Sequence, residues 1–284
     1  MSIAQPAGAI RTIATGPTSD LKFSPNGTSF YVASGASLLV FDTASGAQIA
    51  HYDLGQTIGS FDISADGSRL VAVIPTSGLD PARFALVNLG SGAQQTFNFP
   101  IAGDVKASFY DAAFTANGHL VLSQVGRGPL LDFDFTTGTF TPHGNMFGSA
   151  TLVSSGDQNT VMASTYNGWS GIFTSGVGIT FEKPSNYDPY GGATIPSPTT
   201  PVAALSAALG VYVLGDSLGI VTTPGGVAAP STVNFVGAAS SAVFSPSGTK
   251  LYALHRSRQI VEFDTATWQP TAVYAFNGSL PDTL

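Results

Sequence analysis

The sequence contains no cysteine, and only 10% of its 284 residues are charged. Without cysteine there is neither a disulfide framework nor a thiolate to act as nucleophile or metal ligand. No run reaches about 18 consecutive apolar residues, so the pattern predicts no membrane span. Basic runs are missing as well. With a formal net charge of −7, the chain is not expected to bind nucleic acid.

Charge is replaced by small residues, since glycine, alanine, serine and threonine fill the stretches where lysine and glutamate usually lie. This composition favours an extracellular or cell-surface protein of a bacterium, with a cytoplasmic protein as the alternative. The first residues, MSIAQPAGAIRTIATG, lack the charged and apolar regions of a secretory signal. Export without a cleaved leader is therefore one reading, and a segment of a longer protein or of a larger assembly is another.

The chain repeats one phrase near its two ends. Residues 23–33 read FSPNGTSFYVA and residues 244–254 read FSPSGTKLYAL, and LVFDTASG at 39–46 or IVEFDTAT at 260–267 follows each of them. Weaker copies lie between these, and their shared feature is a turn glycine: Gly27, Gly67, Gly118, Gly156, Gly210 and Gly248. Successive glycines are 40, 51, 38, 54 and 38 residues apart, close to the roughly 40–45 residues of a four-stranded propeller blade.

Each copy can be divided into four short strands, called a, b, c and d in chain order, which are bounded by Gly, Pro, Asn, Asp or Ser. In the first copy we expect strands at about 19–24, 29–34, 38–42 and 47–53. The sequence thus predicts an all-β fold, a β-propeller of four-stranded antiparallel blades, with six blades favoured and seven as the alternative. Residues 17–284 are expected to form a single propeller domain, and residues 1–16 an N-terminal segment with a candidate closing strand at 9–14.

The alternation of FSPNGTSFYVA with LVFDTASG resembles the YVTN-type bacterial β-propeller repeat, a relative of WD40-like blades. The resemblance covers most of the chain, and it is strongest in the first and last copies. It implies a fold rather than an activity, because such families include sugar-lactone hydrolases, quinone-dependent dehydrogenases, surface-layer proteins and binding scaffolds. The function must be argued from the site.

The irregular segments are 74–85, 101–110, 164–171 and 182–200, and all are expected to be connections between strands b and c or between strand d and the next strand a. These connections share one face of a propeller, where variable loops on a rigid scaffold usually bind ligands. The candidate ligand-binding residues on that face are Arg83, Arg127, Tyr166, Trp169, Tyr187, Asp188, Tyr190, His255 and Arg256. Asp20 and Asp111, each three residues before a strand-a phenylalanine, are weak candidates for a hard cation.

Strings that look catalytic do not form a coherent set. Residues 215–219 read GDSLG, but a nucleophile elbow needs a strand-to-helix turn, and this segment is expected to be a hairpin turn. The alternation of Asp132-Phe-Asp134 places both aspartates on one sheet face. His51, His119, His143 and His255 show no metal-ligand spacing, so no metal and no other cofactor is predicted.

The hypothesis that follows is a non-catalytic binding or surface scaffold that recognises a protein, peptide or glycan through its loop-rich face. The alternative is a propeller enzyme, either a lactonase-like hydrolase or a quinone-dependent dehydrogenase. Its site would lie at the channel mouth and would use Asp20, Asp111, Arg83, Arg127 and His255. Whether the chain is an enzyme therefore stays open at this point.

Overall fold

A computed structural model of the chain describes residues 15, 17–77, 80–99, 108–144, 147–155, 157–165, 169–184, 188–194, 202–208, 217–222, 232–234, 239–245, 249–255 and 259–275. Two compact units divide the chain: Ile10–Leu152 is the first, and the described residues from Val153 onward belong to the second. Across these described ranges every regular element is a strand. No helix among them is long and apolar enough to cross a membrane.

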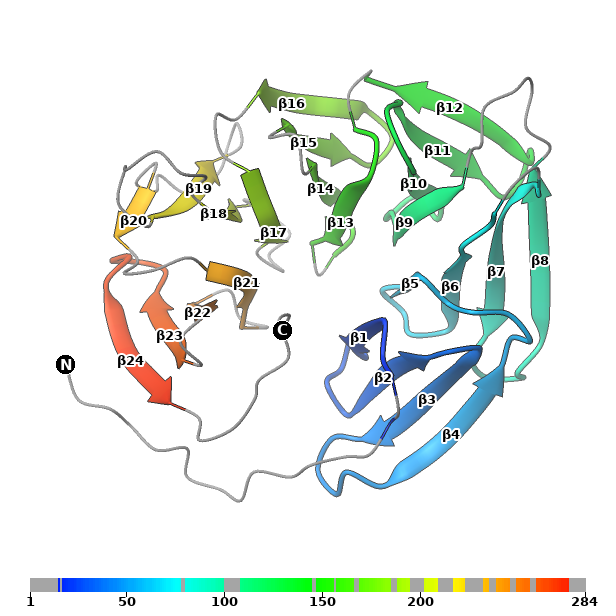
Figure 1. The fold of residues 1–284 in the computed structure, drawn as a ribbon, viewed down its shortest axis with the longest axis horizontal. Coiled ribbons are helices and arrows are strands. Elements are labelled where there is room, and N and C mark those ends of the chain that lie inside the picture. Colours follow the sequence, from blue (N-terminus) through cyan, green and yellow to red (C-terminus); the bar gives the residue numbers. More distant parts are fainter. Residues whose placement is uncertain are drawn as a thin grey trace. The chain divides into compact units, whose positions relative to one another are not determined.

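The described strands form six four-stranded antiparallel sheets, and each sheet uses four strands that are consecutive in the sequence (Figure 1). In each sheet we call the four strands a, b, c and d. The first three sheets are β1 (Asp20–Phe23), β2 (Ser29–Ser34), β3 (Ser37–Asp42) and β4 (Gln48–Asp53); β5 (Ser60–Ile63), β6 (Arg69–Ile74), β7 (Ala82–Asn88) and β8 (Gln94–Phe99); and β9 (Phe109–Phe114), β10 (Leu120–Gln124), β11 (Leu130–Asp134) and β12 (Thr139–His143).

The other three sheets follow in the same order along the chain. They are β13 (Ala150–Ser154), β14 (Thr160–Thr165), β15 (Trp169–Thr174) and β16 (Gly178–Pro184); β17 (Asp188–Thr194), β18 (Val202–Ala208), β19 (Ser217–Thr222) and β20 (Thr232–Asn234); and β21 (Ala239–Phe244), β22 (Lys250–His255), β23 (Gln259–Asp264) and β24 (Pro270–Ala275). This is the all-β arrangement of four-stranded antiparallel blades that the repeat predicts. The preference for six blades over seven in the complete ring stays a prediction.

The repeated phrase is a strand–turn–strand unit. In the first sheet the observed strands lie within two residues of the expected ones. Between β1 and β2 the side-chain oxygen of Asn26 accepts a hydrogen bond from the Thr28 amide at 3.1 Å. Gly27 has a φ of 70°, a conformation that other residues adopt only at a cost. The Asn-Gly pair in the repeated phrase therefore forms a tight turn between two strands.

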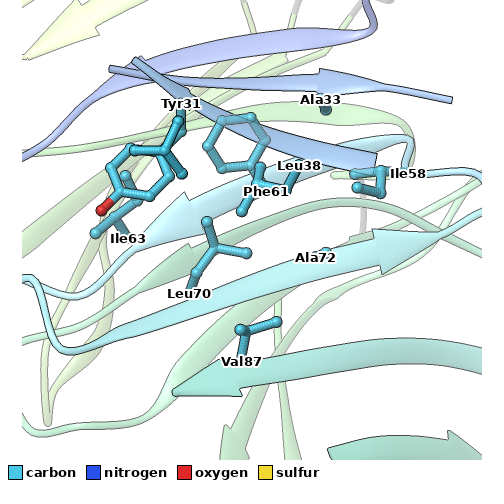
Figure 2. Packing of buried hydrophobic residues seen from close by; sticks show 10 residues of the cluster. Tyr31, Ala33, Leu38, Ile58, Phe61, Ile63, Leu70, Ala72 and Val87 are labelled. Carbon is cyan, nitrogen blue, oxygen red and sulfur yellow. The ribbon is translucent and has the colours of Figure 1, made fainter. Parts of the chain in front are cut away.

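The first core lies between the first two sheets (Figure 2). Tyr31, Leu38 and Val40 of the first sheet pack on one side of it, and they meet Phe61 and Leu70 of the second sheet. Leu38, Phe61 and Leu70 are fully buried. Burial of each such side chain contributes about 1.5–3 kcal/mol relative to an exposed one, so this contact between sheets is a main source of stability.

The second core, between the second and third sheets, is dominated by phenylalanine. Phe84 and Phe133 are fully buried, and their ring centroids are 5.4 Å apart in an edge-to-face contact. Phe97 and Phe99 of strand β8 pack against the same two rings. The guanidinium of Arg69 lies over the ring of Phe114, with its Cζ atom 5.4 Å from the ring centroid. Aromatic pairs of this kind add about 0.5–1.5 kcal/mol each to the energy of burial.

The fifth sheet corrects one sequence prediction. Residues 182–200 were expected to be a long d–a connection, and Gly210 an a–b turn. Strand β16 instead continues to Pro184, and Asp188–Thr194 is itself the inner strand β17, paired with β18. The error arose because Pro and Gly in this segment resemble loop residues, whereas pairing with β18 holds the backbone extended. Gly210 lies outside the described residues, as does the candidate closing strand at 9–14.

Each sheet has two distinct ends. At one end a–b and c–d turns hydrogen-bond to each other, as in Thr43 N to Thr28 O at 3.0 Å. At the other end b–c turns meet d–a connections, as in Ile58 N to Gly35 O at 2.8 Å. We call these the turn end and the loop end. The expectation that b–c and d–a connections lie together is therefore correct for the first three sheets, whose connections carry these hydrogen bonds.

Candidate functional site

The turn ends are occupied by their own hydrogen bonds. The Asp42 carboxylate accepts from the amide and the hydroxyl of Ser45, and these bonds hold the pKa of Asp42 below its usual value. In the second sheet, hydrogen bonds from Ser64 and Ser68 lower the pKa of Asp66 to about 2. These carboxylates are hydrogen-bonded within their own turns and stabilise them.

A hollow of about 430 Å³ lies at the turn ends of the first two sheets. It is lined by Ser24, Pro25, Asn26, Thr28, Ser29, Tyr31, Ala65, Asp66 and Gly67. Two of its polar side chains, Asn26 and Asp66, already accept hydrogen bonds within their own turns. These two side chains are therefore partly occupied by the turns that carry them.

The inner strands β1, β5 and β9 carry aspartates that reach the following sheet. Asp20 Oδ2 accepts from the Phe61 amide at 3.1 Å, and Asp62 Oδ2 accepts from the Phe114 amide at 2.8 Å. Asp111 continues the series, because its Oδ2 accepts from the Leu152 amide at 2.7 Å. Each carboxylate thus clamps one inner strand to the next one in the chain.

Lys22 compensates the charge of these clamps. Its Nζ lies 3.3 Å from Asp62 Oδ1, and the carboxylates of Asp62 and Asp20 raise its pKa although burial alone would lower it. Burial raises the pKa of Asp20, and Lys22 only partly offsets this effect. For Asp111 burial raises the pKa to about 6, against a partial lowering by Lys22. The Lys22 ammonium therefore interacts electrostatically with the carboxylates of Asp20, Asp62 and Asp111.

This arrangement argues against Asp20 and Asp111 as cation ligands. One oxygen of each already accepts an amide of the next sheet, and the other accepts an amide of its own strand, from Leu21 or Ala112 at 2.8 Å. Among the residues that the structure describes, no three histidine or carboxylate side chains are placed to hold a metal ion. The geometry supports the clamp role, which is the more common one for an aspartate of this kind.

The third sheet brings together two histidines and two aspartates. Asp132 and Asp134 lie on the same face, as their alternation predicted, because both are near His119: Nδ1 is 3.0 Å from Asp132 and Nε2 is 3.7 Å from Asp134. His143 Nε2 lies 4.0 Å from the other oxygen of Asp132. Both nitrogens of His119 therefore face carboxylates, so this imidazole is not poised as a base toward a substrate.

The last sheet places a related cluster at the equivalent positions. Glu262 lies two residues before the end of β23, as Asp132 does in β11. Its carboxylate is 3.1 Å from Lys250 Nζ and accepts from the Tyr274 hydroxyl at 2.7 Å. That hydrogen bond raises the pKa of Tyr274 to about 12. In both sheets an acid on strand c is thus satisfied by its own sheet.

At the loop end of the second sheet, Arg83 is held by its neighbours. Its Nη1 donates to Gln56 Oε1 at 3.0 Å, and its Nη2 lies 3.8 Å from Asp80. Gln56 belongs to the d–a connection and Asp80 to the b–c connection. Arg83 therefore joins two loops, and part of its charge is neutralised where it lies.

The loop end of the third sheet is different, because Arg127 is exposed on a braced hairpin. Within the described part of the chain, no hydrogen bond or ion pair to its guanidinium occurs. Beneath it the Gly126 amide donates to Ser149 Oγ at 3.0 Å, and Phe147 N donates to Gly128 O at 2.8 Å. The hairpin that joins β10 to β11, residues 125–129, is the part we call the Arg127 hairpin.

Sequence reasoning missed two residues at this loop end. Val125 is 48% exposed, and Tyr110 on strand β9 is 45% exposed although its neighbours Phe109 and Asp111 are buried. Strand pairing brings them to one region, since Gln124 is opposite Phe109 and Val125 N donates to Ser108 O at 2.8 Å. Segment 101–110 was flagged as irregular, but only the structure shows that Tyr110 is exposed by a break in the register.

The other candidate residues belong to the second unit or to undescribed positions. Trp169 begins β15, Asp188 and Tyr190 lie in β17, and His255 ends β22. Their strand positions are described, but their side chains are not. Tyr166, Tyr187 and Arg256 lie outside the described residues. Of the predicted set, the structure describes the side chains of Arg83 and Arg127 alone, and the joint role of the set stays a prediction.

Ser217 of the GDSLG string is the first residue of strand β19, and it is paired with Asn234 of β20. A nucleophile elbow places its serine between a strand and a helix. Ser217 is instead paired within a sheet, which agrees with the expectation that this string is not a nucleophile motif.

Fold and site together define an all-β protein of four-stranded antiparallel propeller blades. Aspartates clamp the strands β1, β5 and β9 to the next sheet, and the exposed side chains at a loop end include those of Val125, Tyr110 and Arg127. These features define a class of architecture. They do not by themselves define a reaction.

Comparison with known proteins supports the same class. No family model and no curated protein matches the sequence, so the YVTN-type assignment stays a prediction. In contrast, 1629 solved chains resemble the fold, too broad a set to select an activity. One of them is Kuenenia stuttgartiensis hydrazine synthase, a β-propeller-containing protein. It matches with a TM-score of 0.63 and 14% identity over 91% of this chain and 80% of that chain, a likeness in fold alone.

Proposed function

We propose that this protein is a binding scaffold that recognises a protein, peptide or glycan ligand through the loop ends of its sheets. The observation that carries the proposal is the contrast between the two ends of the described sheets. At the turn ends, aspartate carboxylates accept hydrogen bonds from amides of their own turns. At the loop end of the third sheet, Tyr110, Val125 and Arg127 are exposed.

A rigid backbone supports this proposal, because a preformed surface loses little entropy when it binds. In the first unit, each described b–c turn is braced by a neighbouring connection. Thr76 N donates to Ser108 Oγ at 3.1 Å, for example, and Leu54 N donates to Ala36 O at 2.9 Å. Tyrosine and arginine are the residue types that most often dominate protein interfaces. The sparse lysine content further supports our proposal that the scaffold works at a bacterial surface.

The test is a search for ligands followed by matched variants. Immobilised protein is exposed to a displayed peptide library and to a glycan array, and each binder is re-measured with a Tyr110→Ala/Val125→Ser variant. Thr43→Ala, at an exposed turn-end position, is the control. We expect the loop-end variant to lose binding at unchanged thermal stability and the control to keep it. Binders that depend on Thr43 and ignore Tyr110 and Val125, or an absence of binders in both libraries, would contradict the proposal.

A further inference from the structure

The Arg127 hairpin has an unusually constrained support. Gly148 is buried directly beneath it, and a Cβ atom at this position would overlap the carbonyl of Gly126 and the Cα of Arg127. The next residue, Ser149, has a φ of 52°, a conformation that is uncommon for serine and costs energy. Ser149 uses this conformation to donate from its amide to Gln124 O at 2.5 Å and to accept from the Gly126 amide. The unfavourable backbone conformation of Ser149 therefore lies where its hydrogen bonds hold the hairpin.

Three backbone groups of the hairpin are hydrogen-bonded to neighbouring segments. Val125 N donates to Ser108 O, Gly126 N donates to Ser149 Oγ, and Gly128 O accepts from Phe147 N. Among the side chains of the hairpin, those of Val125 and Arg127 are exposed. A guanidinium beside an apolar side chain suits a single carboxylate.

We propose that the Arg127 hairpin is a recognition site for a carboxylate side chain on an acidic protein segment, with Val125 as its apolar neighbour. This inference rests on the proposed binding function and names the class of partner. A guanidinium offers two parallel N–H donors that match the two oxygens of a carboxylate. The net charge of −7 opposes an acidic partner at long range, so the attraction must come from the exposed Arg127 guanidinium itself, for which the described residues supply no hydrogen-bond or ion-pair partner.

The probe is a fluorescein-labelled peptide in which glutamate and glycine alternate, and its partner probe has glutamine in place of glutamate. Binding is measured by fluorescence anisotropy at low and at physiological salt. We expect the glutamate peptide to bind and the glutamine peptide to bind at least about tenfold more weakly. Arg127→Gln should weaken binding of the glutamate peptide by about 10- to 100-fold, and Arg127→Lys by less, because the charge remains while the paired donors are lost.

Two further variants separate position from charge. Gly148→Ala keeps the Arg127 side chain but displaces the hairpin that carries it, so we expect weaker binding at unchanged net charge. Lys250→Gln, at the turn end of the last sheet, makes the same charge change as Arg127→Gln and should bind as the wild type does. Thermal unfolding of each variant shows whether the fold persists. If Gly148→Ala unfolds the protein, the comparison of Arg127→Gln with Lys250→Gln still decides.

Equal binding by wild type and Arg127→Gln would overturn the inference. So would an oligogalacturonate that binds through Arg127 while the glutamate peptide does not, because the partner would then be a glycan. These failures differ from failure of the proposed function. Library binders that depend on Tyr110 and Val125 but not on Arg127 would overturn only the acidic-segment assignment. An absence of any loop-end binder would overturn both.

Discussion

Replacing Asp111 with asparagine removes a charge that the folded protein holds at a cost. The Asp111 side chain is only 7% exposed, and burial raises its pKa from 3.8 to about 6 even though Lys22 and two backbone amides favour the ionised form. Asparagine has almost the same shape, and its carbonyl oxygen can still accept the amide of Leu152. The Ala112 amide loses its acceptor at every pH, so the charge is tested by how the effect of the substitution changes with pH and not by its size at one pH.

The pH dependence has a defined sign. The folded state binds the Asp111 proton more tightly than the unfolded chain, so the stability from this group is fully present below pH 3.8 and is lost as the pH rises through about 6. The difference between 3.8 and about 6 corresponds to about 3 kcal/mol, at about 1.4 kcal/mol for each tenfold change in an equilibrium constant. Asp111→Asn should escape this loss.

The assay is urea unfolding of wild type and Asp111→Asn at intervals between pH 3.5 and pH 7.5. Other carboxylates titrate in both proteins, so the difference between the two free energies of unfolding isolates Asp111. We expect that difference to move by about 3 kcal/mol in favour of the variant as the pH rises, with most of the change between pH 4 and pH 6.5.

Thr43→Ala, which changes no titratable group at an exposed turn position, is the control and should give a flat difference. Parallel stability curves for wild type and Asp111→Asn would refute the reasoning. They would mean that the Leu152 and Ala112 amides, together with Lys22, fully balance the burial of the charge.

Three further outcomes test the clamps, the core and the turns. Lys22→Met should lower the free energy of unfolding by about 3–5 kcal/mol, because it leaves buried carboxylates without their cation. Adding Asp62→Asn should restore part of that loss, which a double-mutant cycle measures. Phe133→Ala should cost about 3–5 kcal/mol in urea unfolding, since its fully buried ring contacts five other rings, and a loss below 1 kcal/mol would contradict that packing. Gly27→Ala should cost about 1 kcal/mol from its φ of 70° alone, because a Cβ there meets no atom within 4 Å; a thermal midpoint equal to that of wild type would show that the turn relaxes.

The repeat predicted much of the fold, for a local reason. Turn glycines and the Asn or Asp beside them set where a strand must stop, as at Asn26-Gly27, and these preferences act over only a few residues. The prediction was wrong in the fifth sheet, where Gly and Pro in residues 182–200 were expected to form a loop. Pairing of β17 with β18 overrides those local preferences, and no residue type within the segment reports it.

The candidate site was less predictable, because its members depend on contacts between distant residues. The sequence singled out Asp20 and Asp111 by position, but their role as clamps follows from amides 41 residues further along the chain. Arg83 and Arg127 looked equivalent as loop cations. The structure distinguishes them, since only Arg83 has Gln56 and Asp80 within reach.

By itself, the sequence determined the strand–turn–strand repeat and the absence of thiol chemistry, because backbone preference and composition are local properties. Only the tertiary structure decided which polar side chains are hydrogen-bonded within the fold and which are exposed. Desolvation, charge compensation and amide pairing depend on neighbours brought together by folding. They place Asp111 in a buried clamp and leave Arg127 exposed on a hairpin that Gly148 and Ser149 hold in place.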